Sequence, residues 1–570
     1  MRLILRASLH VCMVALLSGC PAPPNGPRFL GAGHSAPQYG GTFVFHHESA
    51  VRGLDPHMAF DELSFIAIKL LFDGLLEYDH EAHLIPQLAE ALPEVSSDGK
   101  VFTFRLRKGV FFHNGQPVTT EDIRGSMHHM LSPNVGSPGF TFYAQLDGID
   151  DYRSGKADTI RGIRVLDDYT IEFHLKAPDQ TFLNAMAMTF AYPIPREFYK
   201  NHSQSIAFKP VGTGPFTLES WEQGVRLVFK KNSRYWDPKK PYVNRIVFLE
   251  NLTRDAAIMR FRTGEIDHAH RFSPADYLYF IQSKAWKPYQ IQDAEINIWG
   301  VTMNCGMPPF TNVHVRRAVS FALDREGWSR ARNNRLRATG QPVPPGLLGY
   351  DPQLKGRQVY NLARAKEEMK LAGYPHGIAQ EIDLWIGPGS TGRFYGELTQ
   401  QDLAKIGIKI RLKPVSFPVY IEESGKPGRV PLMISGWSQD FPDPSDFLDI
   451  LFHSRAIHEH DSENRSFYSN PKFDMLLDRA RIEQDVQKRH QLYVKAQEII
   501  VYDAPWAFMW NDLRFEAWQP YVKGYRPHPV WSQYVRDVWL DLPKQRIAQT
   551  STRLLNDLRW AVRLPMKDSY

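Results

Sequence analysis

Cysteine is scarce in this sequence, with three residues among 570, at positions 12, 20 and 305. Cys12 lies in an apolar N-terminal stretch that resembles an export signal, so a processed chain would keep only Cys20 and the distant Cys305. If Cys20 carries a lipid, no internal disulfide is possible. The folded state must therefore depend on a hydrophobic core, and about 550 remaining residues are enough for several domains.

Long hydrophobic runs are also missing. The single apolar stretch, Ala7–Leu17, is shorter than the ~20 residues that cross a membrane as a helix. It follows Arg2 and Arg6, and this order of a positive segment and a short apolar segment is typical of a secretory signal. We therefore expect an exported protein without a membrane-spanning helix.

The apolar stretch ends in Leu17-Ser18-Gly19-Cys20, which resembles the bacterial lipobox. In that motif the cysteine is diacylated and becomes the new N-terminus. We expect residues 1–19 to be a removed signal peptide and residues 20–39, rich in Pro and Gly, to be a flexible tether from lipidated Cys20. The alternatives are an ordinary signal peptide or a chance cysteine. Residue 21 is Pro, so the sequence carries no Asp there to signal retention at an inner membrane.

Several function classes find no support. The net charge of +6 is small for this length and no Lys/Arg block occurs, which argues against nucleic-acid binding. GxSxG, Walker A and HExxH motifs are absent, so we expect no enzyme. The stretch GPGSTG at 387–392 resembles a phosphate loop but lacks the Lys and Ser/Thr ending, and we expect it to turn the chain after a strand.

Histidine is plentiful, with 21 residues, but the pattern does not indicate a metal site. Four groups have two histidines close together: His46-His47, His128-His129, His268-Ala269-His270 and His458-Glu459-His460. None has the i, i+4 spacing of a helical metal site or a CxxC partner. We expect most of them at the surface or in turns, and no metal or other cofactor.

Strand and helix patterns occur in both halves of the chain. Alternating residues predict strands at 100–106, 162–175 and 226–230. In the second half, a strand at 382–386, a helix at 397–405 and a strand at 408–412 predict a βαβ unit with a parallel pair. Further helices are expected at 120–130, 315–323, 445–451, 473–481 and 486–502. Two α/β bodies that face each other would form a ligand cleft at their strand ends.

A series of motifs resembles family 5 solute-binding proteins of bacterial ABC importers, the peptide-, dipeptide- and nickel-binding group. The matching stretches, in family order over about residues 40–540, are LDPH, LFDGLLEYDHEAHLIPQLAEAL, DGKVFTFRLRKGVFFHNGQPVTTEDI, GTGPFTLESWEQG, NSRYWDPKKPYVNRIVF, FTNVHVRRAVSFALDRE and GWSQDFPDPSDFLDILF. The resemblance implies an α/β, periplasmic binding protein-like fold. It would have two lobes, three domains and a hinged interlobe cleft.

The resemblance also implies domain limits and partners. Domain I would be discontinuous (40–72, 200–295 and 510–570), domain II would be inserted (73–199), and domain III would cover 296–509. The protein would be a periplasmic or cell-surface monomer that captures an oligopeptide or dipeptide and passes it to a membrane permease and its ATPase. A nickel, haem or sugar ligand stays an alternative, as does a signalling or adhesive lipoprotein that has kept the fold.

Asp440 is the main candidate for ligand binding. Asp443 stands before Pro444 and an apolar run, so we expect it to cap a helix, whereas Asp440 has no such role. In peptide binders of the family, the Asp three residues after the motif Trp pairs with the peptide α-ammonium, and Asp440 matches that position after Trp437. The alternative is a loop Asp that accepts bonds from local amides.

Other contacts follow from the resemblance alone. Gly436 and Trp437 would line the same wall as Asp440. Phe60 and Asp61 match the segment where the first lobe contacts the peptide backbone. Phe140 lies one position from a pocket aromatic of the family, and Asn304 begins the third domain near the expected cleft floor.

Overall fold

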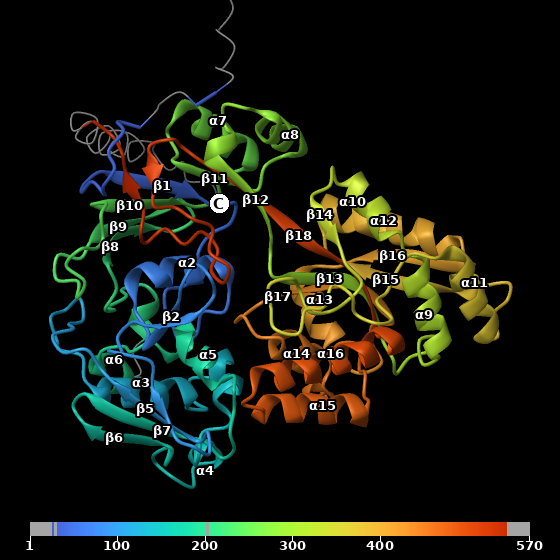
Figure 1. Ribbon diagram of the computed structural model, residues 1–570, viewed down its shortest axis with the longest axis horizontal. Coiled ribbons are helices and arrows are strands. Elements are labelled where there is room, and N and C mark those ends of the chain that lie inside the picture. Colours follow the sequence, from blue (N-terminus) through green and yellow to red (C-terminus); the bar gives the residue numbers. More distant parts are fainter. Residues whose placement is uncertain (1–25, 28–30, 201–203, 544–570) are drawn as a thin grey trace, which may run out of the picture.

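The computed structural model describes residues 26–27, 31–200 and 204–543. The expected signal peptide, Cys20 and much of the tether lie outside these residues. Figure 1 shows two bodies side by side, one formed mostly by the first half of the chain and one by the second. Both combine helices with β-sheets, so the expected α/β class is confirmed.

The first body contains two four-stranded sheets and several short helices. One sheet has the order β1 (Thr42–His46), β10 (Arg245–Leu249), β9 (Arg226–Lys231) and β8 (Phe216–Glu222), and the other has the order β4 (Glu94–Val95), β5 (Val101–Arg105), β7 (Thr170–His174) and β6 (Ile163–Asp167). A small hairpin joins β2 (Leu76–Tyr78) to β3 (Leu84–Pro86). The helices are α2 (Glu62–Leu71), α3 (Thr120–Leu131), α4 (Ile149–Arg153), α5 (Phe182–Ala187), α6 (Arg196–Lys200), α7 (Arg254–Thr263) and α8 (Pro274–Gln282).

Local sequence explains these elements. In β5, Phe102 and Phe104 are buried, while the alternate residues Thr103 and Arg105 are partly or fully exposed. Helix α3 begins with a capping box between Thr119 and Asp122, which satisfies backbone donors of its first turn. The strands predicted at 100–106, 162–175 and 226–230 are confirmed, as is the helix at 120–130.

The second body is built around a mixed sheet covered by helices. Its strands include β13 (Asn297–Met303), β14 (Leu336–Ala338), β15 (Ile378–Ile386), β16 (Ile408–Pro414) and β17 (Leu432–Ser438). The helices are α9 (Val313–Ala322), α10 (Arg325–Ala331), α11 (Leu362–Leu371), α12 (Gly389–Ala404), α13 (Phe417–Ser424), α14 (Ser445–Phe452), α15 (Pro471–Ile482) and α16 (Val486–Asp503). The parallel pairing of β15 with β16 confirms the predicted βαβ unit.

One local prediction differs from the structure. Residues 389–392, expected to turn the chain, form the first turn of α12, so only Gly387 and Pro388 connect this helix to β15. Gly389 begins the helix with a φ of +86°, a value that only glycine adopts easily. A glycine-rich helix start has the composition of a loop, which is why the sequence pattern was misleading here.

Two segments connect the bodies. Strand β18 (Trp506–Trp518) pairs with β13 of the second body through its first half, and with β11 (His268–His270) and β12 (Gln290–Ala294) of the first body through its second half. The chain also crosses directly from β12 to β13. Figure 1 shows β12 and β18 running side by side between the bodies.

The bodies also touch away from these strands. Nε of Arg481 in α15 lies 3.0 Å from Oδ2 of Asp179, and the backbone N–H of Gln180 donates to the carbonyl of Arg481. The rings of Phe142 and Phe441 meet edge to face, with centroids 6.1 Å apart. The space between the bodies is therefore bounded by the connecting strands and by these contacts. The division into three domains stays a prediction.

Among the helices in the described ranges, none is long and apolar enough to cross a membrane. Cys305 is a free thiol with partial burial. The short strands β19 (Val522–Lys523) and β20 (Trp539–Leu540) close the described chain next to the first body.

Candidate functional site

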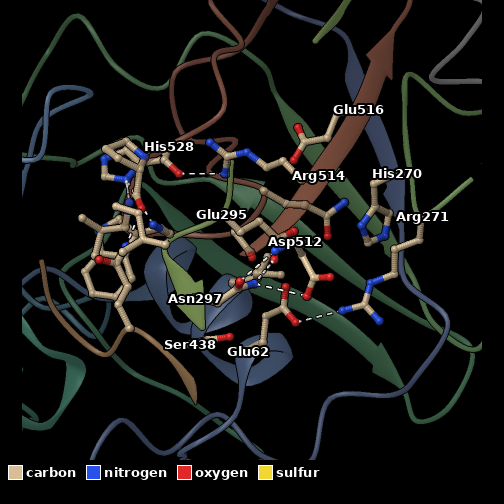
Figure 2. A pocket seen from close by; sticks show the side chains of 18 of the residues that line it. Glu62, His270, Arg271, Glu295, Asn297, Ser438, Asp512, Arg514, Glu516 and His528 are labelled. Carbon is tan, nitrogen blue, oxygen red and sulfur yellow. Dashed lines mark hydrogen bonds and ion pairs between the residues drawn. The ribbon is translucent and has the colours of Figure 1, made fainter. Parts of the chain in front are cut away.

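A cavity of about 810 Å³ lies between the two bodies at the connecting strands. Its wall comes from the start of α2, from β11, from the β12–β13 crossing, from the end of β17, from β18 and from the loop at 528–536. Figure 2 shows charged side chains from these segments converging on it. The volume is within the range that small-molecule sites occupy.

Asp440 lines this cavity from the loop between β17 and α14. Its Oδ2 is buried without a hydrogen-bond partner, and no cation of the described residues lies within ion-pair distance of its carboxylate. Burial, and secondarily the charge of Glu463, raises the pKa of Asp440 from 3.8 to about 7. An ionised carboxylate in this place lacks the compensation that burial requires, and a ligand cation would supply it.

Asp446 is a second carboxylate next to Asp440, and the sequence motifs did not indicate it as a site residue. It is 0% exposed, and its Oδ2 accepts hydrogen bonds from the backbone N–H of Asp440 at 2.8 Å and from Nε1 of Trp437 at 3.4 Å. Burial, and then the charge of Asp440, raises its pKa well above 3.8. An Asp in the first turn of a helix usually serves the helix dipole, so its position gave no signal of a site.

Asp443 has the structural role expected of it, in a modified form. Pro444 takes the N-cap position of α14, and the Asp443 carboxylate accepts from the backbone N–H of Ser445 at 3.0 Å. It also forms two hydrogen bonds with the guanidinium of Arg489, at 2.7 and 2.9 Å. The paired Asp443 and the unpaired Asp440 therefore differ in the way the sequence suggested.

Gly436 and Trp437 both line the cavity, as expected. In the antiparallel pairing of β13 with β17, Gly436 lies opposite Trp299. A Cβ at position 436 would come within 2.3 Å of the Trp299 ring. Glycine therefore allows this ring to lie across the strand and form part of the wall.

Phe60 and Asp61 also line the cavity, from the first body. Phe60 is 44% exposed and its ring lies against those of Phe142 and Phe190. The Asp61 carboxylate caps α2, accepting from the backbone N–H of Ser64 at 3.0 Å and from its hydroxyl at 2.8 Å. The structure thus gives Asp61 a helix-capping role in the cavity wall.

Phe140 and Asn304 are not among the residues that line the cavity. Phe140 packs within the first body, with the Arg153 guanidinium 4.0 Å from its ring centroid. Asn304 is 1% exposed; its Nδ2 donates to the Val430 carbonyl and its Oδ1 accepts from the Gly306 N–H. The structure brings together the other five predicted residues.

Two further carboxylates of the wall were not anticipated. Glu295 follows β12 and Asp512 lies in β18, and both accept from Nδ2 of Asn297, at 2.9 and 3.3 Å. Burial, and then the charge of Asp512, raises the pKa of Glu295 to about 7. Burial also raises the pKa of Asp512, against hydrogen bonds from tryptophan side chains and the charge of Arg332.

The cavity also presents cations. Arg332 and Arg335, after α10, line it without an ion-pair partner among the described residues, although Nη1 of Arg335 donates to the Phe272 carbonyl at 3.2 Å. Lys69 is different, because it bonds Glu77 at 2.9 Å and lies under the Trp531 ring at 3.7 Å. Burial lowers the Lys69 pKa to about 8, while Glu77 opposes that shift.

Of the four histidine groups, the prediction fits only His458 and His460, which are exposed, whereas His128 and His129 lie half-buried in α3. His46, His47, His268 and His270 are 0%, 2%, 0% and 8% exposed and lie together where β1 meets β11. Burial lowers the pKa of His46 to about 3 and of His47 to about 4. The pairs come from strands more than 200 residues apart, so their contact left no local pattern. In the part of the chain described, no group of three or more His, Cys, Asp or Glu is arranged to hold a metal ion.

Comparisons with known proteins agree with this architecture. The family model described as "Bacterial extracellular solute-binding proteins, family 5 Middle" matches residues 83–459. The chain is 29% identical to the di/tripeptide-binding protein 2 of Pseudomonas aeruginosa over 516 residues, 87% of this chain and 94% of that protein. It is 27% identical to the heme-binding protein A of Haemophilus influenzae, over 92% and 97% of the two chains.

A solved structure extends the likeness to the fold. The ABC transporter-associated periplasmic binding protein DppA from Helicobacter pylori, in complex with the peptide STSA, superposes with a TM-score of 0.74 at 28% identity. The match covers 88% of this chain and 99% of that one. Because the family model spans more than half of the sequence, the chain belongs to family 5 of the bacterial extracellular solute-binding proteins.

Proposed function

We propose that this protein is the substrate-binding component of an ABC importer and that its ligand is a small peptide. The observation that carries the proposal is the unpaired carboxylate of Asp440, one oxygen of which is buried, in the cavity between the two bodies. Relatives named for di- and tripeptides, and a similar structure in complex with a peptide, support the ligand class.

The cavity has groups for each part of a zwitterionic peptide. The α-ammonium would lie against Asp440, with Asp446 behind it. The α-carboxylate would lie near Arg332 and Arg335, whose charges have no carboxylate partner in the described residues. Peptide N–H and C=O groups would find backbone partners along the wall, as in strand addition.

The remaining features are proposed with this function. The protein would be exported, lipidated on Cys20 and held to a membrane by the Pro- and Gly-rich tether. Residues 1–19 would be removed, and the three domains would have the limits given above. As a monomer without cofactor or catalytic activity, it would deliver the peptide to a permease and its ATPase by opening at β12 and β18.

Isothermal titration calorimetry with matched peptides tests the role of Asp440. We expect the wild-type protein to bind Ala-Ala-Ala with a free amine much more tightly than N-acetyl-Ala-Ala-Ala. Asp440→Asn should weaken binding of the free-amine peptide by roughly 30-fold or more, because a buried charge pair loses one partner. The acetylated peptide should bind both proteins almost equally.

Glu381→Gln is the control, because it removes an exposed carboxylate of β15 that does not line the cavity. It should leave both affinities unchanged. An equal loss of both peptides in Asp440→Asn would remove Asp440 from the proposed role. If the protein bound haem or a metal chelate and bound none of the peptides, the proposed ligand class would be wrong.

A further inference from the structure

The cavity contains a second pair of carboxylates, Glu295 and Asp512, on the two segments that connect the bodies. The backbone N–H of Glu295 donates to the carbonyl of Asp512 at 2.9 Å, and Asn297 bonds both side chains. Figure 2 shows Glu295, Asp512 and Asn297 together in the middle of the view. Two partly buried carboxylates that accept from the same amide nitrogen repel each other unless a proton or a cation compensates them.

Cations of the described residues compensate this pair only from a distance, because the charge of Arg332 opposes the rise in the pKa of Asp512 but no ion pair joins the two side chains. Arg271, which also lines the cavity, forms an ion pair with Glu62 at 3.1 Å. Arg514 donates to the His528 carbonyl at 2.9 Å and is 3.7 Å from Asp293. Neither Glu295 nor Asp512 has an ion-pair partner within 4 Å among the described residues, and Oε1 of Glu295 accepts no hydrogen bond from them.

His270 provides an independent sign of a missing partner at this end of the cavity. It lines the cavity, is 8% exposed, and has a buried Nε2 without a hydrogen-bond partner. Burial, and then the charges of His46 and His47, lowers its pKa well below 6.5. Its imidazole is therefore neutral and keeps one nitrogen as a possible acceptor. Figure 2 shows His270 and Arg271 on one side of the view and His528 on the opposite side.

We propose that Glu295, Asp512 and His270 form a subsite for a basic group of the bound ligand, so that the protein prefers peptides with a lysine or arginine side chain. This inference rests on the proposed peptide-binding function and names the class of peptide.

The chemistry of the subsite fits such a group. An ammonium offers three donors and a guanidinium five. The free Oε1 of Glu295, the second lone pairs of the Asp512 oxygens and an imidazole nitrogen are the matching acceptors. Charge-assisted bonds of this kind are stronger than neutral ones, and both carboxylates are partly buried.

The charge balance of the whole cavity points the same way. Among the residues that line it, four carboxylates have no ion-pair partner within the described chain, namely Asp440, Glu295, Asp512 and the helix-capping Asp61, and two cations have none, Arg332 and Arg335. A simple zwitterionic peptide brings one cation, for Asp440, and one anion, for the arginines, and this leaves Glu295 and Asp512 without a cation. A peptide with one basic side chain brings two cations and one anion, which can pair with Asp440, with Glu295 and Asp512, and with the two arginines.

Titration calorimetry with lysine and Nε-acetyl-lysine peptides tests the proposal, since acetylation removes the charge and keeps the length. The probes are Lys-Ala-Ala, Ala-Lys-Ala and Ala-Ala-Lys, each against its acetylated counterpart, at pH 7.5. We expect at least one lysine peptide to bind about 10-fold or more tightly than its counterpart. Glu295→Gln and Asp512→Asn should each reduce this preference, and the double variant should abolish it.

The control is again Glu381→Gln, which should keep the full preference. Equal affinity of every lysine peptide and its counterpart in the wild-type protein would overturn the subsite, while Asp440-dependent binding of those peptides would leave the proposed function standing. If the protein bound cadaverine and none of the peptides, the peptide class named here and the proposed function would both be wrong. The wild-type comparison decides even if a variant fails to fold, and melting temperatures identify that case.

Discussion

At the scale of single residues, the cavity keeps charges that the protein does not neutralise. Asp443 and Asp440 are three residues apart, yet the first is bonded twice by Arg489 and the second has no partner for its carboxylate. A buried unpaired charge costs stability, and a protein bears that cost where a ligand later provides the opposite charge. Asp440 is therefore expected to destabilise the empty protein.

This cost predicts a pH dependence. An Asp carboxyl has an ordinary pKa of 3.8, and burial raises the pKa of Asp440 to about 7 in the folded protein. The folded state therefore holds this proton more tightly than the unfolded state. Stability is then lost as pH rises from about 4 to 7 and stays low above that range. Asp440→Asn removes the titration and should stabilise the empty protein at pH 8 by about 2–4 kcal/mol, with almost no gain near pH 4.

Melting temperatures of the ligand-free proteins between pH 4 and 8.5 measure this difference. Glu381→Gln, at an exposed position, should follow the wild-type curve throughout. If Asp440→Asn changed the melting temperature by the same amount at every pH, the carboxylate of Asp440 would already be compensated within the protein.

At the scale of elements, local sequence predicted several helices and strands of both bodies, but not the strands β11, β12, β13, β17 and β18 that line the cavity. Helix α3, strand β5 and the β15–α12–β16 unit follow from alternation, capping residues and helical periodicity. The crossing of β18 between both bodies was not predictable, because the sequence of its 13 residues does not show which partners each half has. Pairing over such distances depends on the whole fold.

The pairing of β13 with β17 makes a prediction at this scale. Gly436→Ala would place a Cβ within 2.3 Å of the Trp299 ring, which stacks on Trp510 at 5.9 Å. We expect a loss of about 1–3 kcal/mol in unfolding free energy, because the ring must move in a packed wall. Peptide affinity should fall with it, since Trp299 lines the cavity.

Chemical denaturation and titration calorimetry measure the two effects. Gly387→Ala is the matched control, because a Cβ at position 387 meets no atom within 4 Å. Its unfolding free energy should change by less than about 0.5 kcal/mol. If Gly436→Ala and Gly387→Ala had equal unfolding free energies, the Trp299 ring could keep its place in the wall without a glycine at position 436.

At the scale of the whole molecule, two bodies share two crossing segments and meet again at Asp179 and Arg481. The cavity between them is assembled from distant parts of the chain, such as Glu295 and Asp512, which share one amide at Asn297. The sequence motifs identified the family and five residues of the wall. They did not reveal the second carboxylate pair or the buried histidines, because those groups meet only after folding.

The central claim is that the cavity holds a small peptide with a free N-terminus. Mass spectrometry of small molecules released by denaturing the protein, after bacterial expression and purification without refolding, tests it most directly. We predict peptides of two to five residues from the wild-type protein, enriched in lysine or arginine, and their loss from Asp440→Asn. Release of haem, a metal chelate or a sugar in place of peptides, or the same peptides from both proteins, would contradict the account.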